Sequence, residues 1–364
     1  MTNDTSTETL RDIRAAAERG DAKAQFNLGW MYDRGEGVAQ DEVEAVYWYR
    51  KAADQGDVAA QVNLSCMYGK GRGVAQDDAQ SNAWTLKAAS QGYPPAQFNL
   101  GVSYEFGRGI AQDDAEAVCW YRKAAEQGLA LAEAKLGFMY ASGRGVTRDD
   151  AQAVAWFRKA ADQGDATAQY NLGHMYAVGQ GIARDDAQAA AWTRKAASQG
   201  HAEAQFNLGA FYKTGRGVAR DDAESVHWYR KAADQGDADA QFNLGCMYKE
   251  GDGVAPDDAE AVFWMGRAAS QGRAKAQFCL GVSYETGVGI AQNYEEAASW
   301  YRKAAEQGNA EAQHNLGFMY RDGRGVAQDN AEAVAWYRKA ADQGLAVAQE
   351  ALREMEASGR GLPK

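Results

Sequence analysis

The chain has 364 residues, of which 46% are hydrophobic, and its 39 Lys and Arg against 50 Asp and Glu give a net charge of −11. This composition is typical of a globular protein, and the acidic balance argues against a general nucleic-acid-binding protein, which needs clustered Lys and Arg. No segment approaches the roughly 18 apolar residues of a membrane span, the N-terminus lacks the features of a secretory signal, and four Cys are too few for a disulfide scaffold. We therefore expect a cytoplasmic protein.

Trp recurs every 36 residues without insertion or deletion, at positions 48, 84, 120, 156, 192, 228, 264, 300 and 336. A fixed period of this kind indicates a repeat architecture. The unit can be read from Ala24, and nine full copies run over residues 24–347. We count this alanine as position one of each copy. Residues 1–23 are predicted to be an N-terminal tail and a capping half-repeat helix, and residues 348–364 a C-terminal capping half-repeat.

Each copy predicts two helices joined by a glycine turn. In the first copy, the first helix reads AQFNLGWMY and ends at Gly35-Glu36-Gly37, because glycine adopts backbone conformations that other residues avoid. The second helix begins at Asp41, and Glu44 completes a capping-box pattern that recurs in all nine copies. Helices this short cannot bury their apolar stripes alone, so neighbouring pairs must stack. We predict an all-α solenoid of about nine helix-turn-helix repeats with half-repeat caps, or about twenty helices.

The unit resembles the Sel1-like repeat, a longer relative of the tetratricopeptide repeat. The resemblance rests on A-x-x-N-L-G-x-M-Y-x-x-G-x-G-V, D-x-x-E-A, W-Y-x-K-A-A and Q-G, and it covers roughly residues 9–361. It implies antiparallel helix pairs wound into a right-handed superhelix, and adaptor work in protein quality control, bacterial signalling or host interaction. One subtype carries a regular Cys pair in each repeat. That subtype is not supported here, because the four Cys fall at three different repeat positions: Cys66, Cys119, Cys246 and Cys279.

Comparison of the nine copies separates packing positions from variable ones. Leu at position five and Tyr at position nine never change, and neither does an alanine pair late in the second helix. The residue before position one and positions three, seven and ten vary. At about 100° per residue, these four lie within roughly 80° of arc on one face of the first helix. By analogy with tetratricopeptide-like folds, stacking would make this face a groove on the concave side.

The variable face carries aromatic residues flanked by mixed charge, which is typical of a protein-binding groove. Position three holds Phe in five copies, which fits packing between adjacent first helices equally well. Position seven is the better functional candidate. The predicted partner-binding residues are Trp30, Phe138, His174, Phe206, Phe242 and Phe318, with a charged rim of Lys213, Lys249 and Arg321.

Two other recurrent features have a structural and a functional interpretation. Asn at position four, found in seven copies, could hold a peptide backbone, but its recurrence favours a hydrogen bond to the neighbouring repeat. Arg-Lys pairs on the second helix, such as Arg50-Lys51, could form a basic ridge for an anionic ligand. We favour a solvated face that complements the helix C-termini.

Enzyme and metal signatures are weak. Some members of the resembled family have been linked to β-lactamase activity or penicillin binding, and Lys213-Thr214-Gly215 matches the K-T-G element of such enzymes. No S-x-x-K accompanies it, and the triplet occupies repeat positions ten to twelve, so we interpret it as coincidence. His174, His201, His227 and His314 are scattered, without zinc-site spacing. We predict no catalytic residue, metal or cofactor.

The sequence therefore predicts a non-enzymatic scaffold or adaptor that binds a protein or peptide partner along its concave face. We expect no nucleic-acid partner, and a monomer is compatible with the sequence. Two alternatives stay open. The first is an inhibitor or regulator of a specific toxin or effector, such as an immunity-type protein. The second is a hydrolase of β-lactam or cell-wall type, which would need a pocket that no motif marks.

Overall fold

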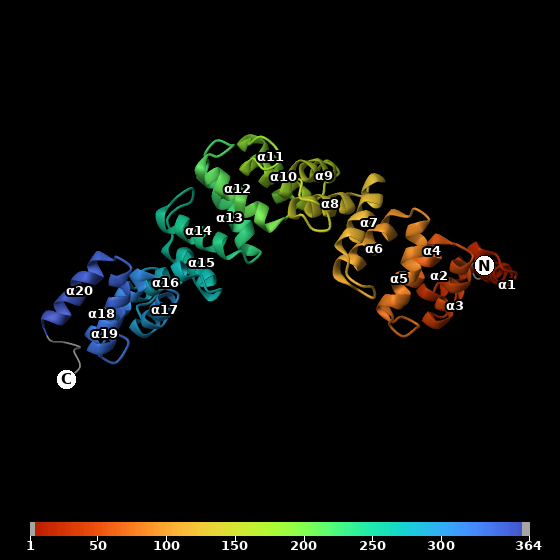
Figure 1. The fold of residues 1–364 in the computed structure, drawn as a ribbon. Helices are drawn as coiled ribbons and strands as arrows, with labels where there is room; N and C mark the ends of the chain where they lie inside the picture. Colours follow the sequence, from red (N-terminus) through yellow and green to blue (C-terminus); the bar gives the residue numbers. More distant parts are fainter. Residues whose placement is uncertain (1–3, 359–364) are drawn as a thin grey trace. The chain divides into compact units, whose positions relative to one another are not determined.

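The computed structural model describes residues 4–358, and within them twenty α-helices and no strand (Figure 1). The helices form two compact units, residues 1–185 and 186–364. The first unit contains α1 (Asp4–Glu18), α2 (Ala22–Arg34), α3 (Glu42–Asp54), α4 (Val58–Lys70), α5 (Asp78–Ser90), α6 (Pro94–Phe106), α7 (Asp114–Glu126), α8 (Ala130–Ser142), α9 (Asp150–Asp162) and α10 (Ala166–Val178).

The second unit contains α11 (Asp186–Ser198), α12 (Ala202–Thr214), α13 (Asp222–Asp234), α14 (Ala238–Glu250), α15 (Asp258–Ser270), α16 (Ala274–Thr286), α17 (Tyr294–Glu306), α18 (Ala310–Asp322), α19 (Asn330–Asp342) and α20 (Ala346–Ala357). Even-numbered helices from α2 onward are the first helices of repeats, and odd-numbered helices from α3 onward are the second helices. The predicted all-α fold and helix number are confirmed. The handedness of the superhelix stays a prediction.

The glycine turn after each first helix is fixed by two left-handed residues, Gly35 (φ 72°) and Gly37 (φ 75°) in the first repeat. In the next eight repeats, the second glycine also touches the preceding repeat. A Cβ atom on Gly73 would lie under 3.0 Å from the backbone at the start of α3, around Glu42 and Val43. Glycine is therefore required at this position both by backbone conformation and by the stacking of one repeat on another. The equivalent residues of the C-terminal half-repeat, Gly359-Arg360-Gly361, lie outside the described residues.

The start of each second helix is held partly as predicted. The Asp41 carboxylate accepts from the backbone N–H groups of Val43 (2.9 Å) and Glu44 (3.1 Å), as an N-cap should. The second half of the predicted capping box, in which Glu44 accepts from the Asp41 N–H, is wrong. That N–H donates instead to the carbonyl of Tyr32, 3.0 Å away, and the equivalent bond forms in all nine repeats. It ties the end of each first helix to the start of the second.

A glutamine at position two links the helices below the surface. Gln25 is buried and donates to the carbonyl of Ala17 on the preceding helix (3.0 Å). It accepts from Gln55, which closes α3 (2.7 Å). Both bonds recur in the repeats of Gln61, Gln97, Gln205, Gln241, Gln277 and Gln313. A buried polar residue is thus satisfied on both its donor and acceptor sides, and three helices are joined by it.

The repeat of α8 departs from this pattern and allows a stability prediction. Its position two is Glu133, which is buried and accepts from Gln163 (2.8 Å), but a carboxylate cannot donate to a carbonyl. Glu133→Gln is therefore expected to raise the free energy of unfolding at neutral pH by about 1 kcal/mol. Urea unfolding of both chains measures this difference.

The advantage of Glu133→Gln should shrink in acid. Burial raises the pKa of the Glu133 carboxyl above its usual range, against the opposing effect of the Gln163 hydrogen bond. A carboxyl whose pKa is raised by folding loses stability as the pH rises from the unfolded pKa through the folded one, so the parent regains stability as the pH falls through that window. A difference independent of pH would contradict this account. Gln97→Glu, the reverse change, should be destabilising.

The first and last helices cover the terminal repeats. Leu10 and Ile13 of α1 pack on a cluster that includes Leu28 and Trp48. At the other end, Met355 of α20 packs against the core of the last full repeat. Both helices therefore bury apolar residues of the adjoining repeat, and their role as caps stays a prediction. None of the described helices is long and apolar enough to cross a membrane.

Candidate functional site

The recurrent basic residues of the second helices are held within the fold. Arg122 donates to the hydroxyl of Tyr140 on the next first helix (3.0 Å). The same bond is made by Arg50, Arg158, Arg194 and Arg302. The neighbouring lysine lies over the Trp of its own helix, with 3.8 Å between the Lys123 ammonium and the Trp120 ring centre. These contacts support the structural interpretation of the Arg-Lys pairs and explain the invariant Tyr at position nine.

Position three is also largely occupied with packing. The Phe206 and Tyr229 rings, from the two helices of one repeat, lie 5.6 Å apart between centres. Equivalent ring contacts are made by Phe26, Phe98, Phe278 and His314. Phe242 is half-buried against the apolar cluster of α15 and α16. Of the predicted partner-binding residues, Phe206 and Phe242 therefore present only part of their rings.

Asn at position four lies toward the preceding second helix. Asn243 and Asn315 interact with the hydroxyls of Tyr229 and Tyr301, and burial raises the pKa of both tyrosines. Where Lys135 replaces Asn, its ammonium lies 3.1 Å from the buried carboxylate of Glu105. These partners support the structural role of position four.

Charges at position ten connect adjacent repeats through the middle residue of the next glycine turn. Arg72 forms ion pairs with Asp33 of the preceding repeat (2.6 Å) and with Glu42 (2.7 Å). Between α12 and the next turn the charges are reversed, and Lys213 pairs with Asp252 (2.5 Å). The predicted rim residue Lys213 is thus engaged by the fold.

The other two rim residues differ from each other. Arg321 pairs with Asp322 (2.7 Å), and its guanidinium carbon lies 4.7 Å from the ring centre of Phe318. Lys249 is exposed, and it forms no ion pair within the part of the chain that the structure describes. Lys249 is therefore the rim residue with the most freedom to meet a partner.

Position seven presents the open side chains of the first helices. Trp30 is 37% exposed and Phe138 is 47% exposed, and His174 is exposed as well. Phe318 is half-buried beneath the Arg321 side chain. Within each unit, we call the surface formed by positions three, four, seven and ten of the first helices the first-helix face.

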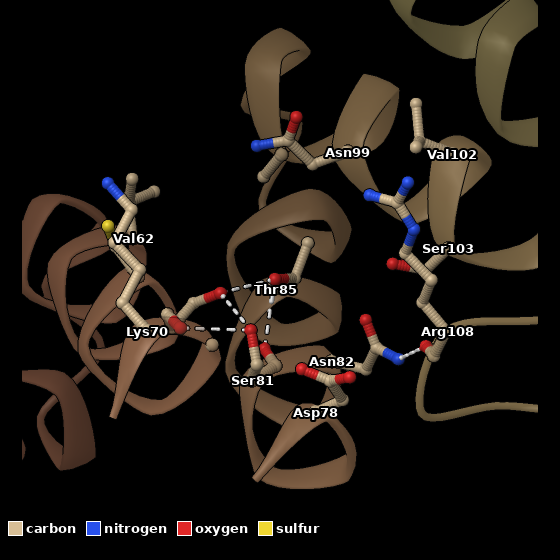
Figure 2. Close-up of a pocket in the computed structure, with 14 residues that line it drawn as sticks. Val62, Lys70, Asp78, Ser81, Asn82, Thr85, Asn99, Val102, Ser103 and Arg108 are labelled. Carbon is tan, nitrogen blue, oxygen red and sulfur yellow. Dashed lines mark hydrogen bonds between the residues drawn. The ribbon is translucent and has the colours of Figure 1, made fainter. Parts of the chain in front are cut away.

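A polar pocket opens on this face in the second repeat (Figure 2). It has a volume of about 520 Å³ and lies among α4, α5 and α6. Two departures from the repeat pattern create it. Thr85 stands where Tyr49 and Tyr121 fill the core of neighbouring repeats, and Ser65 stands where the other eight copies have Gly. The smaller Thr leaves space that a ring occupies elsewhere.

Hydroxyl groups form the floor of the pocket (Figure 2). Thr85 donates to the carbonyl of Ser81 (2.9 Å), and Ser81 donates to the carbonyl of Ser65 (2.9 Å). The Ser65 hydroxyl lies 2.7 Å from that of Thr85. Because these bonds consume the hydroxyl hydrogens, the floor offers oxygen lone pairs to an incoming group.

The rim of the pocket carries charge. Lys70 and Arg108 lie at opposite sides in Figure 2, and Asp78 lies below them. Arg108 occupies the turn position of Arg72, but position ten of the preceding repeat is Gly69 and supplies no carboxylate. Among the described residues, Arg108 forms no ion pair. The pocket can therefore take a polar group that combines hydrogen-bond donors with negative charge.

This pocket was not predicted from the sequence, although the second copy differs from the others at residues that line it. Besides Thr85 and Ser65, the second repeat replaces a recurrent Val with Asn82 and a larger side chain at position ten with Gly69. These changes lie on both helices and are not adjacent in sequence. Only the fold shows that they face one space, together with Cys66 and Val102 of position seven.

The described residues do not assemble a metal site, and the K-T-G triplet lies on a helix. Within the described residues, no three His, Cys, Asp or Glu side chains are grouped so that they could hold a metal ion. Lys213-Thr214-Gly215 forms the end of a helix, where Thr214 donates to the Ala210 carbonyl (2.8 Å) and Gly215 is the left-handed cap. This geometry differs from the strand that K-T-G occupies in penicillin-binding enzymes.

Comparisons with known proteins agree with the repeat geometry. The Sel1 repeat model matches nine segments: residues 22–57, 58–93, 94–129, 130–165, 166–201, 202–237, 238–272, 274–309 and 310–345. No curated protein matches the chain.

Two solved structures are similar over most of their length. A protective antigen of uropathogenic Escherichia coli with an SLR fold is 39% identical, with 97% of this chain and 84% of the antigen covered and a TM-score of 0.80. A Sel1 repeat protein from Oxalobacter formigenes is 36% identical, with 86% and 93% covered and a TM-score of 0.63. An immunity protein from Pseudomonas aeruginosa is 22% identical, with 58% and 81% covered and a TM-score of 0.35.

Sel1 repeat proteins generally mediate protein–protein interaction, and the family is typically non-catalytic. This chain belongs to the Sel1 repeat family.

Proposed function

We propose that this protein is a non-enzymatic scaffold that binds a protein partner on the first-helix face. The observation that carries the proposal is the contrast between recurrent and variable residues. Recurrent Gln, Tyr and Arg side chains are used in contacts within and between repeats. Position seven varies and stays open, with aromatic residues at Trp30 and Phe138. Exposed aromatic residues beside charged groups are what dominates the energetics of protein interfaces.

The pocket of the second repeat supports the same face as the binding surface. It opens beside Cys66 and Val102, which are both position-seven residues. A partner that lies along position seven could insert one polar side chain there. A side chain that donates hydrogen bonds to the hydroxyl floor suits the pocket, and Lys70 and Arg108 at the rim would attract a negative charge beside it. The predicted residue His174 would extend this surface within the first unit, and Lys249 and Phe318 occupy the equivalent face of the second unit.

Replacement of Trp30, Phe138 and Phe318 by Asp is expected to lower partner affinity at least 100-fold while leaving the fold intact. These side chains are open or half-open, and buried aromatic anchors are worth about 2–4 kcal/mol each at interfaces. The experiment is capture from source-cell lysate with the parent and the variant. It is followed by identification of the captured protein and titration with that purified partner. Circular dichroism checks the fold of the variant.

A matched control places Asp on exposed apolar residues of the second helices, at Tyr47 and Leu86. These variants should keep full affinity. If they lose affinity as strongly as the position-seven variant, the first-helix face is the wrong surface. The double variant Thr85→Tyr with Ser65→Gly closes the pocket with the residues that other repeats use, and unchanged affinity would remove the pocket from the proposed site. Loss of the partner's own activity on binding would make this protein an inhibitor or regulator.

A further inference from the structure

One cavity lies on the opposite side of the repeat from position seven, between α15, α16 and α17. It has a volume of about 370 Å³, and Gly266, Tyr284 and Trp300 line it. Gly266 breaks a repeat pattern, because the equivalent residue is Arg in seven of the nine copies. The cavity therefore lies where the chain usually places one of its own guanidinium groups.

The other repeats show how that guanidinium group is held. Arg302 donates to the Tyr320 hydroxyl (2.8 Å), and its guanidinium carbon lies 5.9 Å from the centre of that ring. Arg230 lies 5.4 Å from the ring centre of Tyr248 and 5.9 Å from that of Trp264 in the following repeat. A tyrosine on the next first helix and a tryptophan on the next second helix thus form a cation–π site.

The same aromatic residues are present beside Gly266. Tyr284 is equivalent to Tyr248, and Trp300 is equivalent to Trp264. No Cβ contact would arise at Gly266, since nothing lies within 4 Å of that position. The aromatic walls of an arginine site are therefore retained while its arginine is missing.

The cavity also offers hydrogen-bond acceptors. The Ser270 hydroxyl donates to the Gly266 carbonyl (2.8 Å), which leaves the lone pairs of Ser270 available. The Tyr284 hydroxyl is not reached by any guanidinium of the described residues. Arg267 also lines the cavity, and its guanidinium carbon lies over rings of its own helix, 5.4 Å from the centre of Trp264 and 5.9 Å from that of Phe263. A planar cation with several donors fits these groups, and the net charge of −11 favours its approach.

We propose that the cavity lined by Gly266, Tyr284 and Trp300 binds an arginine side chain of a partner protein. The partner's guanidinium takes the place that Arg230 and Arg302 occupy in their own repeats. Phe263 is 53% exposed beside the cavity and would contact the residues that flank this arginine. The site lies on the second-helix side, so it is independent of the first-helix face and does not rest on the proposed function.

The test uses the full chain and N-acetyl-arginine methylamide as the probe, with the citrulline analogue as a neutral isostere. We expect binding in the millimolar range, on the order of 1–10 mM, as suits one cation–π contact. Nuclear magnetic resonance of the Trp indole N–H groups should show a shift at Trp300. The citrulline analogue should shift it at least fivefold less at equal concentration.

Three variants decide the assignment. Gly266→Arg should fill the cavity with the chain's own side chain and reduce the Trp300 response at least tenfold. Gly266→Ala raises helix propensity without filling the site, so it should keep the response. Tyr284→Phe removes only the hydroxyl acceptor and should weaken binding about threefold or more. An equal response in the parent and in Gly266→Arg, or an equal response to the citrulline analogue, would overturn the proposal.

Discussion

Gly73→Ala is expected to lower the free energy of unfolding of the first unit by about 3–5 kcal/mol. The alanine would have to adopt the left-handed backbone conformation of Gly73, which costs about 1–2 kcal/mol for a non-glycine residue. It would also overlap the backbone around Glu42 and Val43 in the preceding repeat. Backbone atoms at a helix start cannot move aside as a flexible side chain can, so the two repeats must separate. Urea unfolding measures the loss, and hydrogen exchange should show it at the start of α3 and in the turn between α4 and α5.

Gly37→Ala is the matched control. Gly37 occupies the same turn position with nearly the same φ of 75°, but no full repeat precedes it. A Cβ there would meet only the terminal methyl of Met31, at 3.1 Å, and that methyl can turn away. We expect a loss of about 1–2 kcal/mol, which is the conformational part alone. Equal losses in the two variants would show that the contact between repeats contributes nothing.

Tyr121→Ala is expected to cost about 3–5 kcal/mol, because it removes a large side chain from a closed core. Tyr121 is fully buried and donates to Glu105 (2.6 Å), whose carboxylate is only 2% exposed. Lys135 (3.1 Å) and Arg144 (3.3 Å) remain as partners of that carboxylate. The loss should therefore come mainly from the cavity. Denaturant midpoints together with tryptophan fluorescence would measure it.

Thr85→Ala tests the same repeat position where the pocket already exists. Thr85 fills little volume, so its truncation should cost only about 1 kcal/mol through the lost hydroxyl bonds. Comparison of Thr85→Ala with Tyr121→Ala separates the stability that the tyrosine ring contributes from the stability that any side chain at this repeat position contributes. If Thr85→Ala were as damaging as Tyr121→Ala, the hydroxyl network and not the ring would be the main source of stability at this position.

Much of the fold could be predicted because the residues that define the helices and turns recur every 36 residues. Nine copies without insertion locate every helix, and the glycine turn marks where each first helix ends. The bond from the Asp41 N–H to the Tyr32 carbonyl could not be anticipated, because it joins backbone atoms whose approach depends on how the two helices pack. The Gln25 network was equally hidden, since hydrophobic periodicity does not identify a polar residue that is buried with both partners supplied.

The candidate site, too, could be predicted only in part. Exposure at Trp30 and Phe138 follows from helical geometry, so position seven could be identified from variability alone. The ion pair between Lys213 and Asp252 could have been found by comparing copies. It has the same positions as the pair between Asp33 and Arg72, with the charges reversed. The two compact units could not be predicted, because the 36-residue spacing continues through their boundary unchanged.

The reversed charge pair has a consequence for how such an array can evolve. Unequal recombination between copies adds or removes one whole module, and the backbone bonds would form again at a new junction, as would the glutamine bonds where position two is Gln. The ion pair between position ten and the next glycine turn would not form again at every new junction. A module that ends with Lys213 and is followed by one that carries Arg72 would place two cations together, whereas Asp33 followed by Asp252 would place two carboxylates together. At the junctions that carry such a pair, charge polarity thus limits which module can follow another.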